Sequence, residues 1–145
     1  MSYKVLSKRE AQIIAAMAGG VIPRGGKSFD LGAADLEDKW LFRTDHMLSR
    51  MPIMTRLSLR MIIHVLNYAW PLLYMKEFKP LTDMDEQERT ELFHIIEQAT
   101  FPGPLTILVV KMLVFPAFYG LPEVKHAIDY QEKFPNSPDY VGPKD

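Results

Sequence analysis

The sequence predicts an all-α fold, a compact bundle of about five helices followed by an extended, Pro-containing C-terminal tail. Apolar residues recur at spacings of three and four along most of the chain, as they do on one face of a helix. No run alternates apolar and polar residues cleanly enough to predict a strand. Helix caps and Gly or Pro breaks separate these segments. We therefore expect a single helical domain over residues 1–130 and a tail over residues 131–145.

Length and composition limit the classes of function that this chain can have. A chain of 145 residues buries about 68–70% of its unfolded surface. The 17 Lys and Arg residues balance 18 Asp and Glu residues, which argues against a nucleic-acid-binding face. Cysteine is absent, which excludes disulfides, thiolate-bound metals and a cysteine nucleophile. With neither an apolar signal-peptide core nor a twin-arginine motif, we expect a cytoplasmic protein, periplasmic only if exported with a partner.

The first two helices are marked by caps and breaks. Ser7–Glu10 fits a capping box, and the helix that it begins is expected to end at Gly19–Gly20. Residues 22–28 form a Gly-containing connector that lacks the spacing of a phosphate-binding loop. A second helix is expected over residues 33–50, because an imperfect apolar stripe runs through it and Pro52 follows.

The third helix has the clearest pattern. Its apolar side carries Ile53, Leu57, Ile63, Leu66 and Trp70. Another side carries polar residues at spacings of four, four and three, namely Arg56, Arg60, His64 and Asn67. We expect this polar side to be a solvated helix face, with binding of an anionic partner, phosphate or cofactor as the alternative. Pro71 is expected to kink or end the helix.

The last two main helices differ in character. The fourth follows a connector at residues 78–81, with Thr82 or Asp83 as its cap, and it breaks at residues 101–103. The fifth, residues 104–119, is apolar on nearly every side, so it must be buried all round by its own chain, a partner or lipid. It falls short of the ~20 apolar residues that a membrane span needs. We expect it to be the central core helix, followed by a short turn.

Two Glu-x-x-His pairs are the strongest candidate for chemistry. They are Glu91 with His94 and Glu123 with His126. In di-metal helix bundles such pairs ligate the metals together with carboxylates from two further helices. Glu123 directly follows a proline in a short terminal segment, which does not suit a long bundle helix. We therefore expect no catalytic, cofactor-binding or metal site, with a helical di-metal carboxylate protein as the alternative.

Several short blocks occur in the same order as in a known family. The chain resembles the gluconate 2-dehydrogenase subunit 3 family over about residues 5–130. The first block is Leu6-Ser7-x-x-Glu10 with Val21-Ile22-Pro23, and the second is Leu36 to Trp40 after Gly32-Ala33. The third is Phe78-x-x-Leu81 before an acidic helix with Arg89. The fourth is Leu113-Val114 with Phe118-Tyr119-Gly120-x-Pro122-Glu123-Val124, followed by Ile128-Asp129-Tyr130. The family's usual ending has glycine before this tyrosine, where the chain has Asp129, and exported members carry a twin-arginine signal that is missing here.

The resemblance implies a non-catalytic accessory subunit. Family members bind a larger FAD-dependent subunit of the glucose-methanol-choline oxidoreductase type, so FAD is expected in the partner and no cofactor on this chain. A further electron-transfer subunit is an additional expected partner. Aromatic residues are the expected interface contacts, namely Trp70, Tyr74, Phe78, Phe118, Tyr119, Tyr130 and Tyr140. The remaining alternative is a peripheral membrane protein in which residues 61–75 or 105–119 lie on a lipid surface without spanning it.

Overall fold

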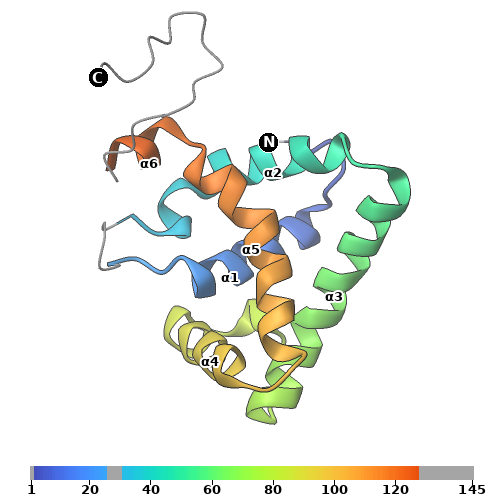
Figure 1. Cartoon of the computed structure of the whole chain (residues 1–145), viewed down its shortest axis with the longest axis vertical. Coiled ribbons are helices and arrows are strands. Elements are labelled where there is room, and N and C mark those ends of the chain that lie inside the picture. Colours follow the sequence, from blue (N-terminus) through green and yellow to red (C-terminus); the bar gives the residue numbers. More distant parts are fainter. Residues whose placement is uncertain (1, 26–30, 128–145) are drawn as a thin grey trace, which may run out of the picture.

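The computed structural model describes residues 2–25 and 31–127, which form an all-α bundle (Figure 1). Its α-helices are α1 (Lys8–Val21), α2 (Glu37–Ser49), α3 (Ile53–Met75), α4 (Glu86–Gln98), α5 (Gly103–Tyr119) and α6 (Pro122–Ala127). Short 3-10 helices at Ala33–Leu36 and Leu81–Asp83 precede α2 and α4. The predicted all-α helical bundle is confirmed. The predicted tail, residues 131–145, lies outside the described residues.

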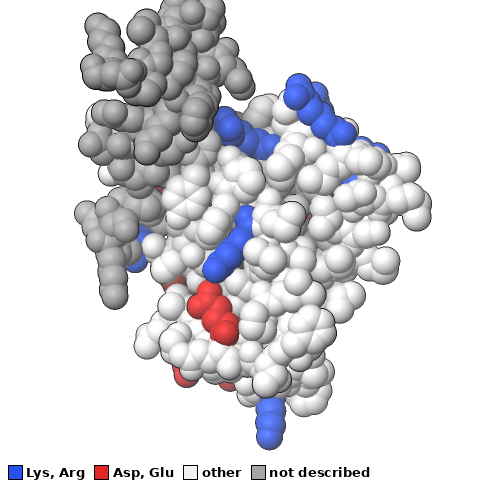
Figure 2. All heavy atoms as spheres, viewed as in Figure 1, with Lys and Arg blue, Asp and Glu red and all other residues white. Residues whose placement is uncertain are grey.

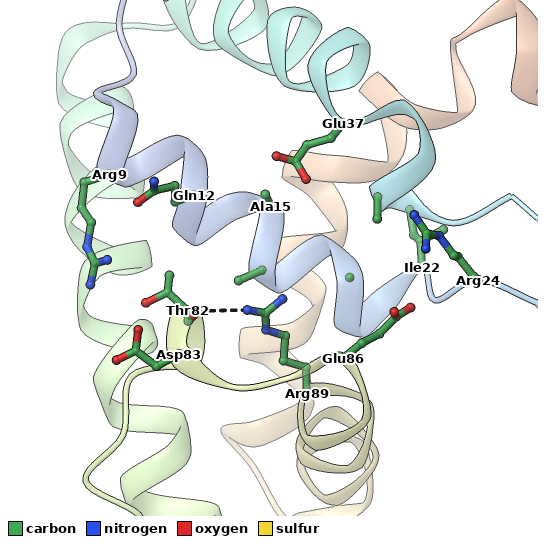
Figure 3. Close-up of a pocket in the computed structure, with 13 residues that line it drawn as sticks. Arg9, Gln12, Ala15, Ile22, Arg24, Glu37, Thr82, Asp83, Glu86 and Arg89 are labelled. Atoms are coloured by element: carbon green, nitrogen blue, oxygen red, sulfur yellow. Dashed lines mark hydrogen bonds between the residues drawn. The ribbon is translucent and has the colours of Figure 1, made fainter.

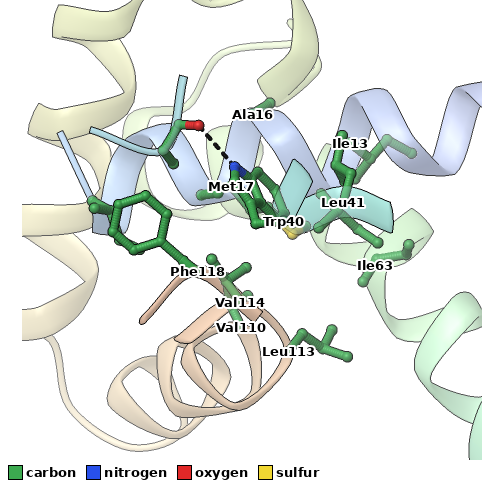
Figure 4. Close-up of a cluster of buried hydrophobic side chains, with 14 of the residues drawn as sticks. Ile13, Ala16, Met17, Trp40, Leu41, Ile63, Val110, Leu113, Val114 and Phe118 are labelled. Carbon is green, nitrogen blue, oxygen red and sulfur yellow. Dashed lines mark hydrogen bonds between the residues drawn. The ribbon is translucent and has the colours of Figure 1, made fainter. Parts of the chain in front are cut away.

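Helix α1 lies at the centre of the bundle. It packs against α2, α3, α4 and α5. Its side chains Ile13 and Met17 meet apolar residues from α2, α3 and α5, such as Trp40, Ile63 and Phe118 (Figure 4). Burying each of these large side chains contributes roughly 1.5–3 kcal/mol. The Trp40 indole N–H also donates to the Ala33 carbonyl at 2.7 Å, which fixes the entry to α2.

Helix α5 is covered on one side only. Ile107, Val110 and Val114 are buried against α1, α2 and α4. On the opposite side Leu108 and Met112 are exposed, Met112 at 66% of its full area. The expectation that α5 is the central core helix is therefore wrong, because the described helices cover it from one direction; cover of its outer side is left to a partner or lipid. The central position belongs to α1.

Two helices extend past residues that were expected to interrupt them. Helix α1 continues through Gly19 and Gly20 and ends one residue later, at Val21. Helix α3 continues through Pro71, which is buried, to Met75, so Pro71 does not end it; the C-cap Lys76 has the left-handed conformation with φ 56°. In both places the residue that disfavours a helix packs within the fold, and this burial outweighs the local preference.

The caps of α1 and α4 share one design. The Ser7 hydroxyl accepts from the Glu10 N–H, and the Glu10 carboxylate accepts from the Ser7 N–H, as the capping box predicts. Helix α4 begins with a second capping box, between Asp85 and Glu88. The cap is thus Asp85, and the predicted caps Thr82 and Asp83 lie in the preceding 3-10 helix.

Candidate functional site

The polar side of α3 binds an acidic group of the same chain. The Arg60 Nε donates to Glu10 Oε1 at 2.8 Å, and His64 Nε2 lies 3.4 Å from that oxygen. Glu10 is buried, which opposes its ionisation, but hydrogen bonds from Arg60 and Ser7 outweigh this effect and hold the pKa of Glu10 below its ordinary value. Asn67 is fully buried and accepts from the Thr82 N–H. Three of the four residues on the expected solvated face therefore make contacts within the chain: Arg60 and His64 with α1, and Asn67 with the 3-10 helix before α4.

The two Glu-x-x-His pairs lie on separate helices. Glu91 and His94 are exposed on α4, where His94 contacts Gln98 at 3.2 Å. Glu123 on α6 pairs with Lys39, and His126 is exposed. Figure 1 places α4 and α6 at opposite ends of the molecule. Within residues 2–25 and 31–127, no group of three or more Asp, Glu or His is arranged to hold a metal ion.

A polar pocket of 430 Å³ opens between α1, α4 and the start of α2 (Figure 3). Arg89 crosses it and donates to the carbonyls of Leu81 and Thr82 at 3.1 and 3.0 Å. Burial lowers the pKa of Arg89, although nearby carboxylates favour its charged form. On the other wall, burial raises the pKa of Glu37. Because the Arg89 N–H groups donate to these main-chain carbonyls, Arg89 holds the 3-10 helix before α4 in place.

The polar pocket lacks a nucleophile–base pair. The described residues that line it include no Ser, Cys, His or Lys, and its one hydroxyl belongs to Thr82. The Thr82 Oγ1 is buried and makes no hydrogen bond with residues 2–25 or 31–127. Three arginines and three carboxylates share the lining, namely Arg9, Arg24, Arg89, Glu37, Asp83 and Glu86. Sequence reasoning missed this pocket because its residues come from four separate segments; Arg89 entered only through the family resemblance.

Exposed apolar side chains gather on the outward sides of α3 and α5. We call this surface the apolar face, and it comprises the exposed side chains of Ile53, Met54, Leu57, Met61, Ile62, Val65, Tyr68, Leu72, Leu73, Leu105, Leu108 and Met112. On α3, Met61, Val65, Tyr68 and Leu72 follow at spacings of four, three and four, so they form one stripe. This stripe points away from Ile63 and the other α3 residues that face the core.

The two parts of the apolar face meet at one end of the bundle. The Trp70 indole N–H on α3 donates to Thr106 Oγ1 on α5 at 3.0 Å. A Cβ at Gly103, the first residue of α5, would lie 3.0 Å from the Tyr74 hydroxyl. Phe78 and Phe101 project from the connectors before and after α4, with 95% and 79% of their areas exposed. The protein thus presents exposed aromatic rings close to two apolar helix faces.

Charge is sparse on this part of the surface. Helix α3 contains no Asp or Glu, and the one charged residue of α5, Lys111, pairs with Glu97 at 3.4 Å. Figure 2 shows few charged side chains over α5 and the adjoining part of α3. Large exposed apolar patches mark interaction sites on proteins.

The aromatic residues predicted as interface contacts differ in how far they are exposed. Phe78 is exposed, and Tyr74 and Tyr119 are half-buried. Trp70 and Phe118 are 1% and 0% exposed and belong to the core, so they do not reach the surface in this fold. Tyr130 and Tyr140 lie outside the described residues. Sequence reasoning pointed to residues 61–75 as a possible contact surface, but it did not identify which aliphatic and Met side chains of α3 face outward.

No family model, curated protein or solved structure matches the chain. No helix within the described parts of the chain is both long and apolar enough to cross a membrane.

Proposed function

We propose that this chain is a non-catalytic accessory subunit that binds and stabilises a larger FAD-dependent dehydrogenase subunit of the alcohol or sugar type. The observation that supports this proposal is the apolar face on α3 and α5. Obligate interfaces resemble a protein core cut in two, and they commonly bury ~2,000 Å² or more. The flavoprotein nature of the partner rests on the resemblance of residues 5–130 to the subunit 3 family. FAD belongs to the partner in this proposal.

The geometry suggests how such a subunit acts. Helices α3 and α5 are each anchored to the core on one side, so their outer side chains are presented on a rigid support. A partner that covers these side chains gains their burial without ordering a flexible segment. Tyr68, Phe78 and Phe101 are the exposed aromatic residues best suited to anchor the contact. The compartment follows the partner: cytoplasmic, or periplasmic if the complex is exported.

Purification of the tagged chain from its native cells tests the proposal. We expect a yellow, FAD-containing large chain to co-purify with it in a fixed ratio. The double variant Met61→Lys/Val65→Lys is expected to lose this chain, because it places two charges in the centre of the α3 stripe. Gln87→Lys/Gln98→Lys, which adds the same charge on the exposed surface of α4, is the matched control and should retain it. Recovery of the wild-type chain without any flavoprotein would overturn the partner assignment.

Attachment to a membrane surface is the second candidate function. Helix α3 has arginines but no acidic residue, and interfacial helices combine an apolar face with basic residues. Co-sedimentation with vesicles that contain phosphatidylglycerol tests this candidate on the purified chain. Binding that is lost in Met61→Lys/Val65→Lys would favour the membrane over a protein partner.

A further inference from the structure

We propose that a second pocket, at the C-terminal ends of α2 and α5, binds the anionic head group of an amphiphile. The ligand class is a carboxylate or phosphate carried on an apolar chain. The pocket has a volume of 650 Å³ and lies between the N-terminal segment, α2 and α5. We call it the basic pocket. It does not belong to the polar pocket, and the inference does not depend on the proposed function.

Every ionisable side chain that lines the basic pocket is basic. These side chains are Lys4, Arg43, His46 and Arg50. None of them forms a salt bridge or a side-chain hydrogen bond with another described residue. The whole chain has a formal net charge of −1, so this grouping is a local excess of positive charge. An anion that enters the pocket therefore meets the cationic side chains of Lys4, Arg43 and Arg50, which have no partner among the described residues.

The nearest acidic residue on α2 does not neutralise the pocket. Asp45 is only 2% exposed and does not line the pocket. Its carboxylate accepts backbone N–H groups from Lys4, Val5 and Leu6 at 2.7, 2.9 and 2.9 Å. Asp45 thus fastens the N-terminal segment to α2 and holds Lys4 at the pocket wall.

Gly120 makes room for one of the cations. A Cβ at Gly120 would lie 2.5 Å from Arg43 Nη2 and 2.7 Å from the Pro116 carbonyl oxygen. The Arg43 guanidinium is therefore seated on bare backbone at the end of α5. The glycine of the Phe118-Tyr119-Gly120 block acquires a physical role here, because any larger residue would push Arg43 from this position.

The remaining lining is apolar, which a site for a bare inorganic anion would not need. It consists of Phe42, Met47, Pro116 and Ala117. Pro116 continues the exposed line of Leu105, Leu108 and Met112 along α5 at helical spacing. From Leu105 to Pro116 this line is about 16 Å long. An alkyl chain can follow it while its head group stays among the cations.

Helix dipoles explain part of the arrangement but not all of it. Cations are favoured near helix C-termini, and α2 and α5 both end close to the basic pocket. This effect places basic residues there without a ligand. It does not explain why an exposed Phe42 and the end of an apolar stripe share the same pocket. The combination of the two surfaces is what points to an amphiphile.

Calorimetric titration of the full chain with octyl phosphate tests the inference. We expect saturable binding to one site, weakened by added salt and at least tenfold weaker for octyl glucoside, which has the same alkyl chain and a neutral head. Inorganic phosphate alone should also bind at least tenfold more weakly. Equal binding of octyl phosphate and octyl glucoside would overturn the proposal, as would no binding of octyl phosphate.

Variants locate the site. Arg43→Gln/Arg50→Gln is expected to weaken octyl phosphate binding at least tenfold, whereas the control Arg56→Gln/Lys76→Gln, outside the pocket, should retain it. All four side chains lie outside the buried core, so thermal melts should show that both variants fold. Equal effects of the two variants would overturn the assignment. Vesicles with and without phosphatidylglycerol distinguish a bilayer lipid from a free amphiphile: Arg43- and Arg50-dependent co-sedimentation identifies the lipid, and binding of octyl phosphate alone identifies the free amphiphile.

Discussion

At the scale of single residues, Glu10 connects two elements. One of its carboxylate oxygens accepts a hydrogen bond from the Ser7 N–H and completes the cap of α1. The other accepts a hydrogen bond from the Arg60 Nε–H on α3. The Glu10 side chain is 4% exposed and that of Arg60 is 33% exposed. A buried carboxylate without its partners would be strongly unfavourable, so the cap and the ion pair depend on each other.

This arrangement predicts a specific pH dependence. Because the pKa of Glu10 is lowered on folding, Glu10 contributes stability that is fully present above its ordinary pKa of 4.5 and is lost as the pH falls through the lower folded value. Glu10→Gln should reduce the free energy of unfolding at pH 7 by about 1–3 kcal/mol. It should also flatten the fall in stability below pH 4.5.

Urea unfolding at pH 7 and at several lower pH values measures both effects. Glu91→Gln, on the exposed surface of α4, is the matched control and should leave the acid dependence unchanged. An unchanged acid slope in Glu10→Gln would contradict the role given to the Glu10 carboxylate.

The sequence predicted one of the two contacts of Glu10, the capping box with Ser7, but not the ion pair with Arg60. The spacing of Ser7 and Glu10 is a local signal, and the capping box is confirmed. The pairing of Glu10 with Arg60 joins residues that are 50 positions apart. One sequence gives the spacing of polar residues on a helix, but it does not show which other helix they face. The cations of the basic pocket were missed for the same reason, because three segments supply its lining.

At the scale of elements, a glycine sets how closely α1 and α4 pack. A Cβ at Gly20 would lie 2.1 Å from Phe93 Cδ2, so the Phe93 ring occupies the space that a side chain would need. Gly19, one residue earlier in the same helix, has no atom within 4 Å of such a Cβ. Adjacent glycines of α1 therefore have opposite roles.

Alanine substitutions should separate these roles. Gly19→Ala is expected to stabilise the protein by roughly 0.5–1 kcal/mol, since alanine favours the helix and meets open space. Gly20→Ala is expected to destabilise it by about 1–3 kcal/mol, because the overpacking of Phe93 exceeds the gain in helix propensity. Thermal or urea unfolding of the two variants measures both. Stabilisation by both substitutions would show that α4 moves away from Gly20 at little cost.

Packing between helices explains why α1 and α3 extend past Gly20 and Pro71. A pair of glycines and a proline are local signals that end helices in isolation. In the fold, Gly20 packs under Phe93, and Pro71 is buried beside Trp70, which contacts Phe93 edge to face at 5.1 Å between ring centres. Packing between helices thus extended both helices beyond their local signals. Such packing depends on which helices meet, and the sequence pattern does not contain that information.

At the scale of the whole molecule, the chain has more apolar helix surface than its own core can cover. The composition predicted that the segment that forms α5 has more apolar surface than one core contact can bury. The structure shows that the chain covers only one side of α5. It also adds α3, where Ile63, Leu66 and Trp70 face the core and a second apolar stripe faces outward. An all-α fold was predictable from periodicity, whereas the uncovered side required knowledge of how the helices are arranged.

This surplus predicts the behaviour of the isolated chain. Without a partner, the apolar face should cause reversible self-association at micromolar concentrations and binding of the dye ANS, while the helix content is retained. Met61→Lys/Val65→Lys should reduce both properties. Its free energy of unfolding should stay within about 0.5 kcal/mol of wild type, because both side chains are already exposed. Sedimentation velocity over a concentration series, with unfolding measured in parallel, tests this, and Gln87→Lys/Gln98→Lys, on the exposed surface of α4, controls for added charge alone. A wild-type chain that stays monomeric and binds no dye would show that the apolar face has no need of a partner.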